Sequence, residues 1–169
     1  MQDQEELMPD VPELLELPEL PPAVWKKALW AGAGSSLAIL LLQLIGRGLH
    51  HPLLLAPFGA SCVLLFLLPD SPLAQTRNVV ASYAMATAIG FLVLWLFPGD
   101  WWAAALAVGA TISLMTVTHT VHPPAGAHPL VILLGAPAWK VLLPTLVAGL
   151  LLLVVSAWAF HRWVPMQRA

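Results

Sequence analysis

Uncharged, apolar runs fill most of the chain after residue 24, and this pattern constrains the fold more than any other feature. The chain is 59% hydrophobic and only 9% charged, whereas about a quarter of the residues in soluble domains are charged. A helix needs about 20 apolar residues to span a bilayer, with about 17 as the lower limit. We therefore expect an all-α, multi-pass integral membrane protein. Its six apolar runs are residues 25–45, 52–68, 79–97, 101–117, 123–135 and 142–160.

The second and fifth runs differ from the other four, because proline and glycine interrupt each of them near its start. The interruptions are Pro-Phe-Gly at 57–59 and Pro-Ala-Gly at 124–126. Proline suits the first turn of a helix, where its missing N–H would have no partner anyway. We expect short helices over 57–68 and 124–135, each about 18 Å long at 1.5 Å per residue, inside a hydrocarbon core of about 30 Å. The fold prediction is thus four full helices and two short helices that begin within the membrane.

An internal repeat is the next feature, since residues 57–61 align with residues 124–128 and a similar apolar run follows each. A long helix, a broken short helix and a long helix then occur twice. Three crossings are an odd number, so a second copy continuing in the same chain enters the membrane upside down. We expect an inverted 3+3 repeat within a transmembrane domain at 23–164, with repeats at about 25–97 and 98–161.

Inverted repeats place broken helices near the bilayer midplane, with their N-termini directed at an anionic substrate. The first turn of a helix offers unpaired N–H groups and a partial positive charge, so two such ends can bind an anion without lysine or arginine. The alternative is that the two glycines only allow close helix packing. The candidate substrate-binding donors are the backbone N–H groups of Gly59, Ala60, Ser61, Gly126, Ala127 and His128.

Three histidines, His119, His122 and His128, surround the Pro123-Pro124 pair. An imidazole at membrane depth is costly unless it faces a cavity or a partner. The histidines could line a path, where protonation at about pH 6 to 7 adds positive charge beside an anion, or they could cap the broken helix. A metal site is the third interpretation, but no carboxylate or thiol accompanies them. We take His122 and His128 as substrate-binding candidates and His119 as a pathway candidate.

Charge outside the apolar runs bears on topology. Seven acidic and no basic residues precede Pro21, so we expect an acidic tail over 1–22 that is mobile or loosely helical up to about Pro18 and could bind a cytoplasmic partner. No signal peptide is recognisable, because such a segment starts basic.

The positive-inside rule favours cytoplasmic termini in a bacterial plasma membrane. With six crossings, Lys26, Lys27, Arg77, Arg162 and Arg168 share the side of the termini, against Arg47 and Lys140; if the short helices are re-entrant, Arg77 changes side.

Catalytic chemistry has no recognisable basis in the sequence. The apolar runs hold no Asp or Glu, and neither a nucleotide-binding loop nor a triad pattern occurs. The single cysteine, Cys62, lies inside an apolar run and is interpreted as a packing residue. We expect no enzyme activity, no cofactor, no metal and no nucleic-acid partner.

Two blocks carry a resemblance to a known family. HPPAGAHP at 122–129 and APFGASCVLLFLLPDSPLAQTRN at 56–78 resemble the HPP family of small integral membrane proteins, and the similarity extends over about 25–160. By this resemblance His122, Pro123 and Pro124 form the signature, while Gly59, Ala60, Ser61, Arg77 and Asn78 match the second block. The family is usually described with four transmembrane helices and has been associated with nitrite transport in cyanobacteria and plastids.

The resemblance implies a transporter or channel for a small inorganic anion, with nitrite as the leading candidate. Arg77 and Asn78 are then pathway or gating candidates, although Arg77 could instead be an interfacial anchor. A homo-oligomer in the lipid bilayer is expected. Two other functions stay open at this point: a membrane anchor whose acidic tail binds a cytoplasmic protein, and a membrane metal enzyme built on the histidines.

Overall fold

The computed structural model describes residues 21–164, and every regular element in that range is helical. Of the predicted acidic tail over 1–22, only positions 21 and 22 are among the described residues. Arg168 also lies outside them. The all-α prediction is therefore confirmed for the part of the chain that the structure describes.

Three helices are long and apolar enough to cross a membrane. They are α2 (Pro22–Gly48), α4 (Thr76–Leu96) and α7 (Trp139–Trp163). The fourth predicted full helix, α5 (Ala103–Val117), has only 15 residues, or about 22 Å. It is shorter than its apolar run because the chain turns at Gly99, whose φ is +85°, and helical structure resumes only after Trp102.

Both interrupted runs form composite helices whose starts differ from the prediction. In the first, α3 (Ala56–Cys62) continues into a π-helical turn, η1 (Val63–Leu67). In the second, a 3₁₀ turn, η3 (Pro123–Ala127), precedes α6 (His128–Gly135). An α-helix starting at Pro124 is wrong: the Ala125 N–H donates to the His122 carbonyl at 3.0 Å, an i→i−3 bond that fixes a 3₁₀ turn.

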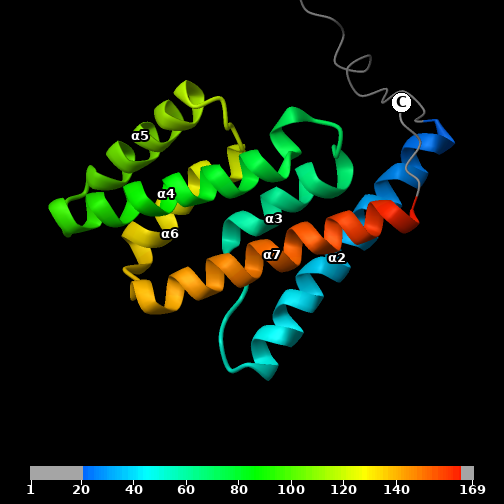
Figure 1. Ribbon diagram of the computed structural model, residues 1–169, viewed down its shortest axis with the longest axis horizontal. Coiled ribbons are helices and arrows are strands. Elements are labelled where there is room, and N and C mark those ends of the chain that lie inside the picture. The colour runs from blue at the N-terminus through cyan, green and yellow to red at the C-terminus, as the bar shows by residue number, and fades with distance from the viewer. Residues whose placement is uncertain (1–20, 165–169) are drawn as a thin grey trace, which may run out of the picture.

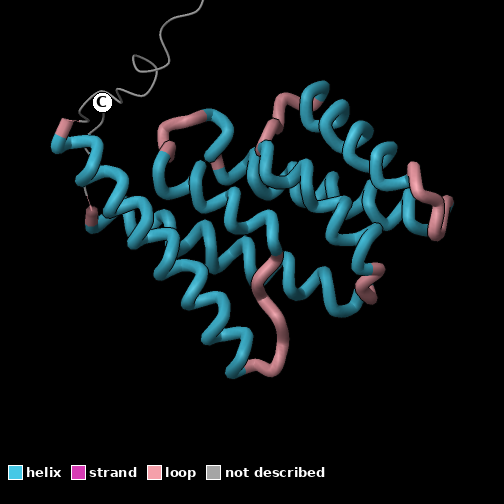
Figure 2. Tube along the Cα trace, turned by 180° about the vertical axis from the view of Figure 1, so that it is seen from behind, coloured by secondary structure: helices cyan, strands magenta, loops and turns pink. Residues whose placement is uncertain are grey.

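α3 and α6 both begin near the centre of the molecule and run toward opposite ends of it (Figure 1). The start of α2 and the end of α7 lie together at one end (Figure 1). Seen from behind, the loop after α2 returns from the far end of that helix to the middle of the molecule, where α3 begins (Figure 2). A short 3₁₀ turn, η2 (Pro72–Ala74), precedes α4 in the chain, and α5, η3 and α6 lie between α4 and α7.

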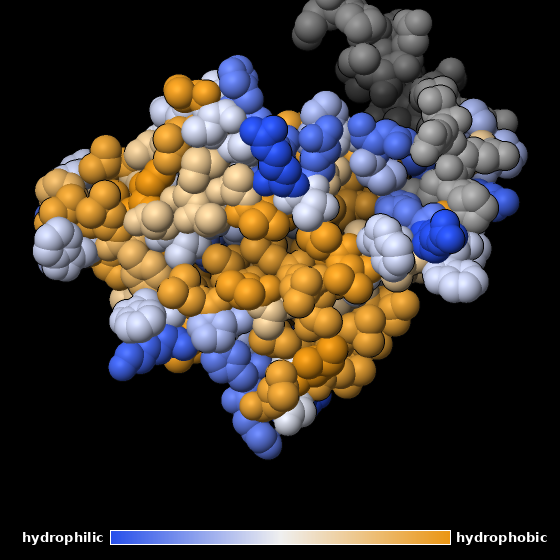
Figure 3. Space-filling model, viewed as in Figure 1, coloured by the Kyte–Doolittle hydropathy of each residue, from blue (hydrophilic) through white to orange (hydrophobic). Residues whose placement is uncertain are grey.

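The surface is largely apolar, and the hydrophilic residues gather along the upper edge and at the bottom of the visible face (Figure 3). The upper group extends from the loops beside α4 and α5 to the start of α2 and the end of α7, and the lower group lies around the end of α2 and the start of α7. All eight tryptophans are at least 37% exposed, so none of them fills the core. Exposed apolar surface between polar ends is what a lipid-embedded chain requires.

Close helix contacts depend on particular glycines. A Cβ at Gly149 of α7 would lie 2.7 Å from the Leu53 carbonyl oxygen and against the ring of Phe58. A Cβ at Gly90 of α4 would lie 2.7 Å from Cδ1 of Ile132 in α6. Small residues at these points let both broken helices pack against long ones.

Candidate functional site

The buried polar side chains converge around Tyr83, which lies on the inward face of α4 and is fully buried. Its ring packs edge-on against Phe58 of α3 at 5.6 Å and against His128 of α6 at 5.4 Å between centroids. The ring of His122, just before η3, lies at 5.8 Å. Both broken helices and one long helix thus meet at a single tyrosine. We call Ser61, Tyr83, His122 and His128 the histidine cluster.

A chain of hydrogen bonds links three members of this cluster. The His122 Nδ1 atom lies 2.8 Å from the Leu73 carbonyl oxygen, and a carbonyl only accepts, so Nδ1 carries the proton. In the neutral ring Nε2 then accepts from the Ser61 hydroxyl at 2.9 Å. The Ser61 oxygen in turn accepts from the Tyr83 hydroxyl at 3.0 Å. Both nitrogens of His122 therefore have a hydrogen-bond partner, and the donor and the acceptor of each bond in the chain are defined.

His128 is the exception within the cluster. Its side chain is 0% exposed, yet neither Nδ1 nor Nε2 has a hydrogen-bond partner. Buried polar atoms in proteins nearly always have a partner, and an unpaired one costs about 1–3 kcal/mol. A ring that keeps two unpaired nitrogens at membrane depth is suited to a small polar ligand or water.

The segment that carries His122 is fixed by contacts between α4 and the end of α5. Ser82 of α4 donates to the Thr120 carbonyl, and the hydroxyls of Thr118 and Thr120 lie 2.7 Å apart. Between them His119 adopts a left-handed conformation with φ +54° and is exposed. The turn therefore directs His122 inward and leaves His119 outside the cluster.

The structure brings together only part of the predicted anion-binding set. The Ser61 side chain belongs to the cluster, whereas Gly59, Ala60 and Ala127 are exposed and Gly126 is half-buried. The prediction that the backbone N–H of His128 is free is wrong, because this group donates to the Ala125 carbonyl. His128 is the fifth residue counted from Pro124, so its N–H would also be paired in an α-helix starting there; the 3₁₀ geometry only moves the acceptor to the i−3 carbonyl.

The two pathway candidates of the loop after η1 have different surroundings. Asn78 is buried and its amide donates to the Pro72 carbonyl at 2.8 Å, so it ties η2 to α4. Arg77 is exposed at the start of α4, a position typical of an interfacial anchor. Asn78 is linked to the histidine cluster only through η2, in which the Pro72 carbonyl bonds Asn78 and the Leu73 carbonyl bonds His122.

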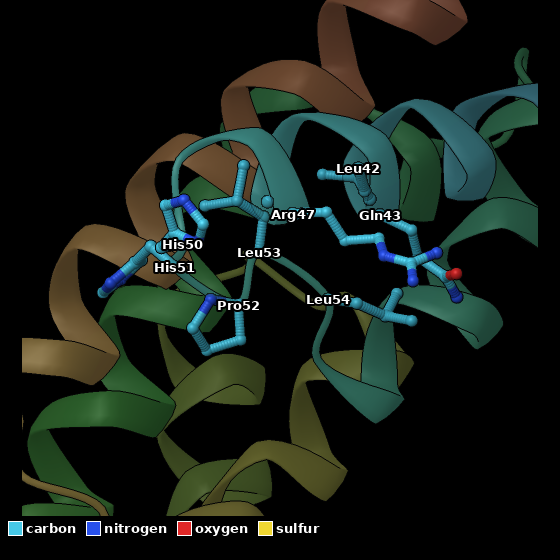
Figure 4. A pocket seen from close by; sticks show the side chains of 9 residues that line it. Leu42, Gln43, Arg47, His50, His51, Pro52, Leu53 and Leu54 are labelled. Atoms are coloured by element: carbon cyan, nitrogen blue, oxygen red, sulfur yellow. The ribbon is translucent and has the colours of Figure 1, made fainter.

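A separate groove of about 660 Å³ lies at the end of α2 (Figure 4). The groove contains Arg47 and His50, but most of its lining is apolar, and it shares no residue with the histidine cluster. Among residues 21–164, no three His, Cys, Asp or Glu side chains are grouped closely enough to hold a metal ion. The groove is lined by Leu42, Gln43, Gly46, Arg47, His50, His51, Pro52, Leu53 and Leu54.

Sequence reasoning missed Tyr83 and Phe58. Tyr83 is the only tyrosine of the chain, and it lies in a membrane helix whose buried face also carries Asn78, Ser82 and Thr87. Polar residues at i, i+4 spacing inside an apolar run are a usable signal of a polar helix face. Phe58 offered no such signal, because nothing in an apolar run distinguishes one buried aromatic residue from another.

Comparisons with known proteins agree with this architecture. The family model of the HPP transmembrane region matches residues 20–169. A transmembrane protein of Dictyostelium discoideum is 31% identical over 154 residues, which cover 81% of this chain and 54% of the relative. A second Dictyostelium transmembrane protein is 34% identical over 119 residues, covering 63% of this chain and 37% of the relative. The chain therefore spans about half the length, or less, of these relatives, and no solved structure matches it.

Proposed function

The chain belongs to the HPP transmembrane family, and on that premise we propose that it carries a small inorganic anion across the membrane, with nitrite as the leading candidate. The observation that carries the proposal is the unpaired, fully buried ring of His128 between the two broken helices. A structural histidine would be expected to have partners, as His122 has. A ligand that comes and goes accounts for a site left without permanent partners.

We place the anion between α3 and η3–α6, in contact with His128 and beside Ser61 and Tyr83. The exposed positions Gly59, Ala60 and Ala127 belong to the outer surface of these segments and are not part of the site in this proposal. Selectivity would come from the size of the site and from its pattern of donors. His122 holds Ser61 in position and contacts the substrate only through it.

An inverted 3+3 repeat is part of the same proposal. It is supported by the opposite directions of α3 and α6, which both start near the centre of the molecule (Figure 1). The segment between α2 and α4 then crosses the membrane once, as does the segment between α5 and α7. Six crossings put Lys26, Lys27, Arg77 and Arg162 on one side and Arg47 and Lys140 on the other. The positive-inside rule then places the first group in the cytoplasm.

A non-transporting membrane anchor is the alternative function. Such a protein needs only an apolar core. Buried hydroxyl and imidazole groups would lower its stability without serving a function. The described core instead buries four polar side chains at the contact between the broken helices. This arrangement favours transport over anchoring, and we assign no catalytic role to any of the four.

The test is anion uptake by the purified full chain in proteoliposomes. Nitrite, nitrate, formate, chloride and sulfate would be compared at one pH against vesicles without protein. We expect uptake of small monovalent anions above that background and no uptake of sulfate, because a cluster without lysine or arginine cannot compensate two negative charges. If none of the five anions enters faster than in empty vesicles, the protein is not the transporter proposed here.

A further inference from the structure

The ring of His128 offers two nitrogens and has no fixed partner for either. A neutral imidazole presents one donor and one acceptor, and a protonated imidazole presents two donors. Tyr83 contacts the ring edge-on at 5.4 Å between centroids and makes no hydrogen bond to either nitrogen. His122 cannot serve in this way, because Leu73 and Ser61 occupy both of its nitrogens.

The surroundings of His128 contain no fixed charge. Among residues 21–164, the buried polar side chains are serine, threonine, asparagine and histidine, and none is Lys, Arg, Asp or Glu. Helix α6 begins at His128, but the backbone N–H of His128 already donates to the Ala125 carbonyl. An anion that entered alone would therefore be a buried charge without a counter-charge, which is the most expensive arrangement in a membrane interior.

We propose that the anion crosses together with one proton, which His128 and the bound anion exchange between them, so that transport is electrically neutral. This inference rests on the proposed function and adds that anion transport is coupled to proton transport. One anion and one proton enter from the same side. The proton resides either on the imidazole, facing the anion, or on the anion, facing the neutral imidazole. Both leave on the other side, and His128 returns to its neutral, unpaired state.

The hydrogen-bonding capacities match this cycle. The protonated form of a weak-acid anion has an O–H donor, which complements the unprotonated nitrogen of a neutral imidazole. After proton transfer, the same nitrogen carries an N–H that donates to the bare anion. A small anion contacts one of the two unpaired nitrogens at a time, because they point away from each other across the ring.

Few other groups on the surrounding elements can titrate. The buried titratable side chains are Tyr83 of α4, Cys62 of α3 and His122 before η3. The buried residues of α5 and α7 are apolar, glycine or threonine, and those of α2 are glycine, alanine and leucine. Tyr83 and His122 are committed to the hydrogen-bond chain with Ser61. His128 is therefore the proton carrier that this arrangement points to.

The experiment uses the full chain in vesicles of zwitterionic and anionic phospholipid, with nitrite as the probe and a pH-sensitive dye trapped inside. A pH gradient, acidic outside, should drive nitrite accumulation together with internal acidification, above protein-free vesicles that report passive diffusion of nitrous acid. A potassium diffusion potential set with valinomycin should leave the rate unchanged. Nitrite flux that follows the voltage and moves no protons overturns this inference while leaving the proposed function standing. Absence of protein-dependent flux contradicts both.

Two variants identify the proton carrier. His128→Gln keeps a donor and an acceptor at the site but cannot take up a proton, so the pH-driven nitrite flux should fall by about tenfold or more, as expected for loss of a hydrogen bond to a charged group. His50→Asn, at an exposed left-handed position outside the cluster, is the matched control and should retain the flux. The unfolding midpoint of both variants in detergent monitors folding. A folded His128→Gln protein that keeps proton-coupled flux would refute the assignment to His128.

Discussion

At the scale of single residues, the two buried histidines of the HPPAGAHP block at 122–129 are distinguished by their partners. His122 and His128 are both 0% exposed, but the first makes two hydrogen bonds and the second makes none. A fully bonded buried group stabilises a unique packing, whereas an unpaired one destabilises the fold unless a ligand binds. This difference is the basis of the positioning role proposed for His122 and the ligand-binding role proposed for His128.

This difference predicts opposite effects of two identical substitutions. His128→Leu removes two unpaired nitrogens, so stability should be unchanged or should rise, by up to about 1–3 kcal/mol. His122→Leu leaves the Leu73 carbonyl and the Ser61 hydroxyl without their partner and should lower stability by a similar amount. Denaturant unfolding in detergent micelles measures both values. Equal destabilisation by the two changes would show that His128 has partners that the structure does not contain.

The direction of the hydrogen-bond chain gives a second prediction. Ser61→Ala leaves both the Tyr83 hydroxyl and His122 Nε2 unpaired, whereas Tyr83→Phe leaves the Ser61 donor bond to His122 in place. We expect a loss of about 2–4 kcal/mol for the first change and about 0.5–1.5 kcal/mol for the second. The double variant should lose less than the sum of the two, because both remove the same bond. Additive losses would contradict the chain.

At the scale of elements, the position of α3 depends on how closely α7 approaches it. Gly149 of α7 faces the Leu53 carbonyl and the ring of Phe58, and it leaves no space for a methyl group. Phe58 packs in turn on Tyr83. A single backbone contact on α7 is thereby connected to the histidine cluster.

Gly149→Ala should therefore displace the start of α3. The backbone of residue 53 cannot rotate away as a flexible side chain could, so we expect a loss of about 1–3 kcal/mol, despite the higher helix propensity of alanine. Gly109→Ala on α5 is the matched control, since its Cβ would meet nothing within 4 Å, and it should leave stability unchanged or slightly raised. Thermal unfolding in micelles compares the two variants. An unaffected Gly149→Ala protein would mean that α7 and α3 are not in close contact.

At the scale of the whole molecule, the start of α2 and the end of α7 share one end (Figure 1). In the proposed topology, Lys27 and Arg162 lie on one side of the membrane, and the connection between α6 and α7, with Lys140, lies on the other. The chain suits a labelling experiment, because its only cysteine, Cys62, is buried.

We expect Lys27→Cys and Arg162→Cys to react with a membrane-impermeant maleimide from the same side. Lys140→Cys should react only from the opposite side, and the unaltered chain should not react before it is denatured. Sealed vesicles, and the same vesicles after permeabilisation, provide the two measurements. Labelling of Lys27→Cys and Arg162→Cys from different sides would require an odd number of crossings and would exclude the proposed inverted repeat.

The sequence alone determined that the chain is a helical membrane protein and where its segments are interrupted. Both conclusions depend on local physics: the length of an apolar run against the thickness of a bilayer, and the missing N–H of proline. The same local reasoning failed at α5 and at η3. The turn after Gly99 shortens α5, and the i→i−3 bond of Ala125 forms a 3₁₀ turn where an α-helix was expected.

Only the tertiary structure decided which polar groups meet. Ser61, Tyr83 and His122 come from three separate segments, and nothing in their spacing indicates that their side chains form one chain of hydrogen bonds. From the sequence alone, His122 and His128 were equivalent substrate-binding candidates. Their difference lies in which partners the packing of α3, α4 and η2 supplies, because a buried imidazole is defined by the groups around it and not by its neighbours in the sequence.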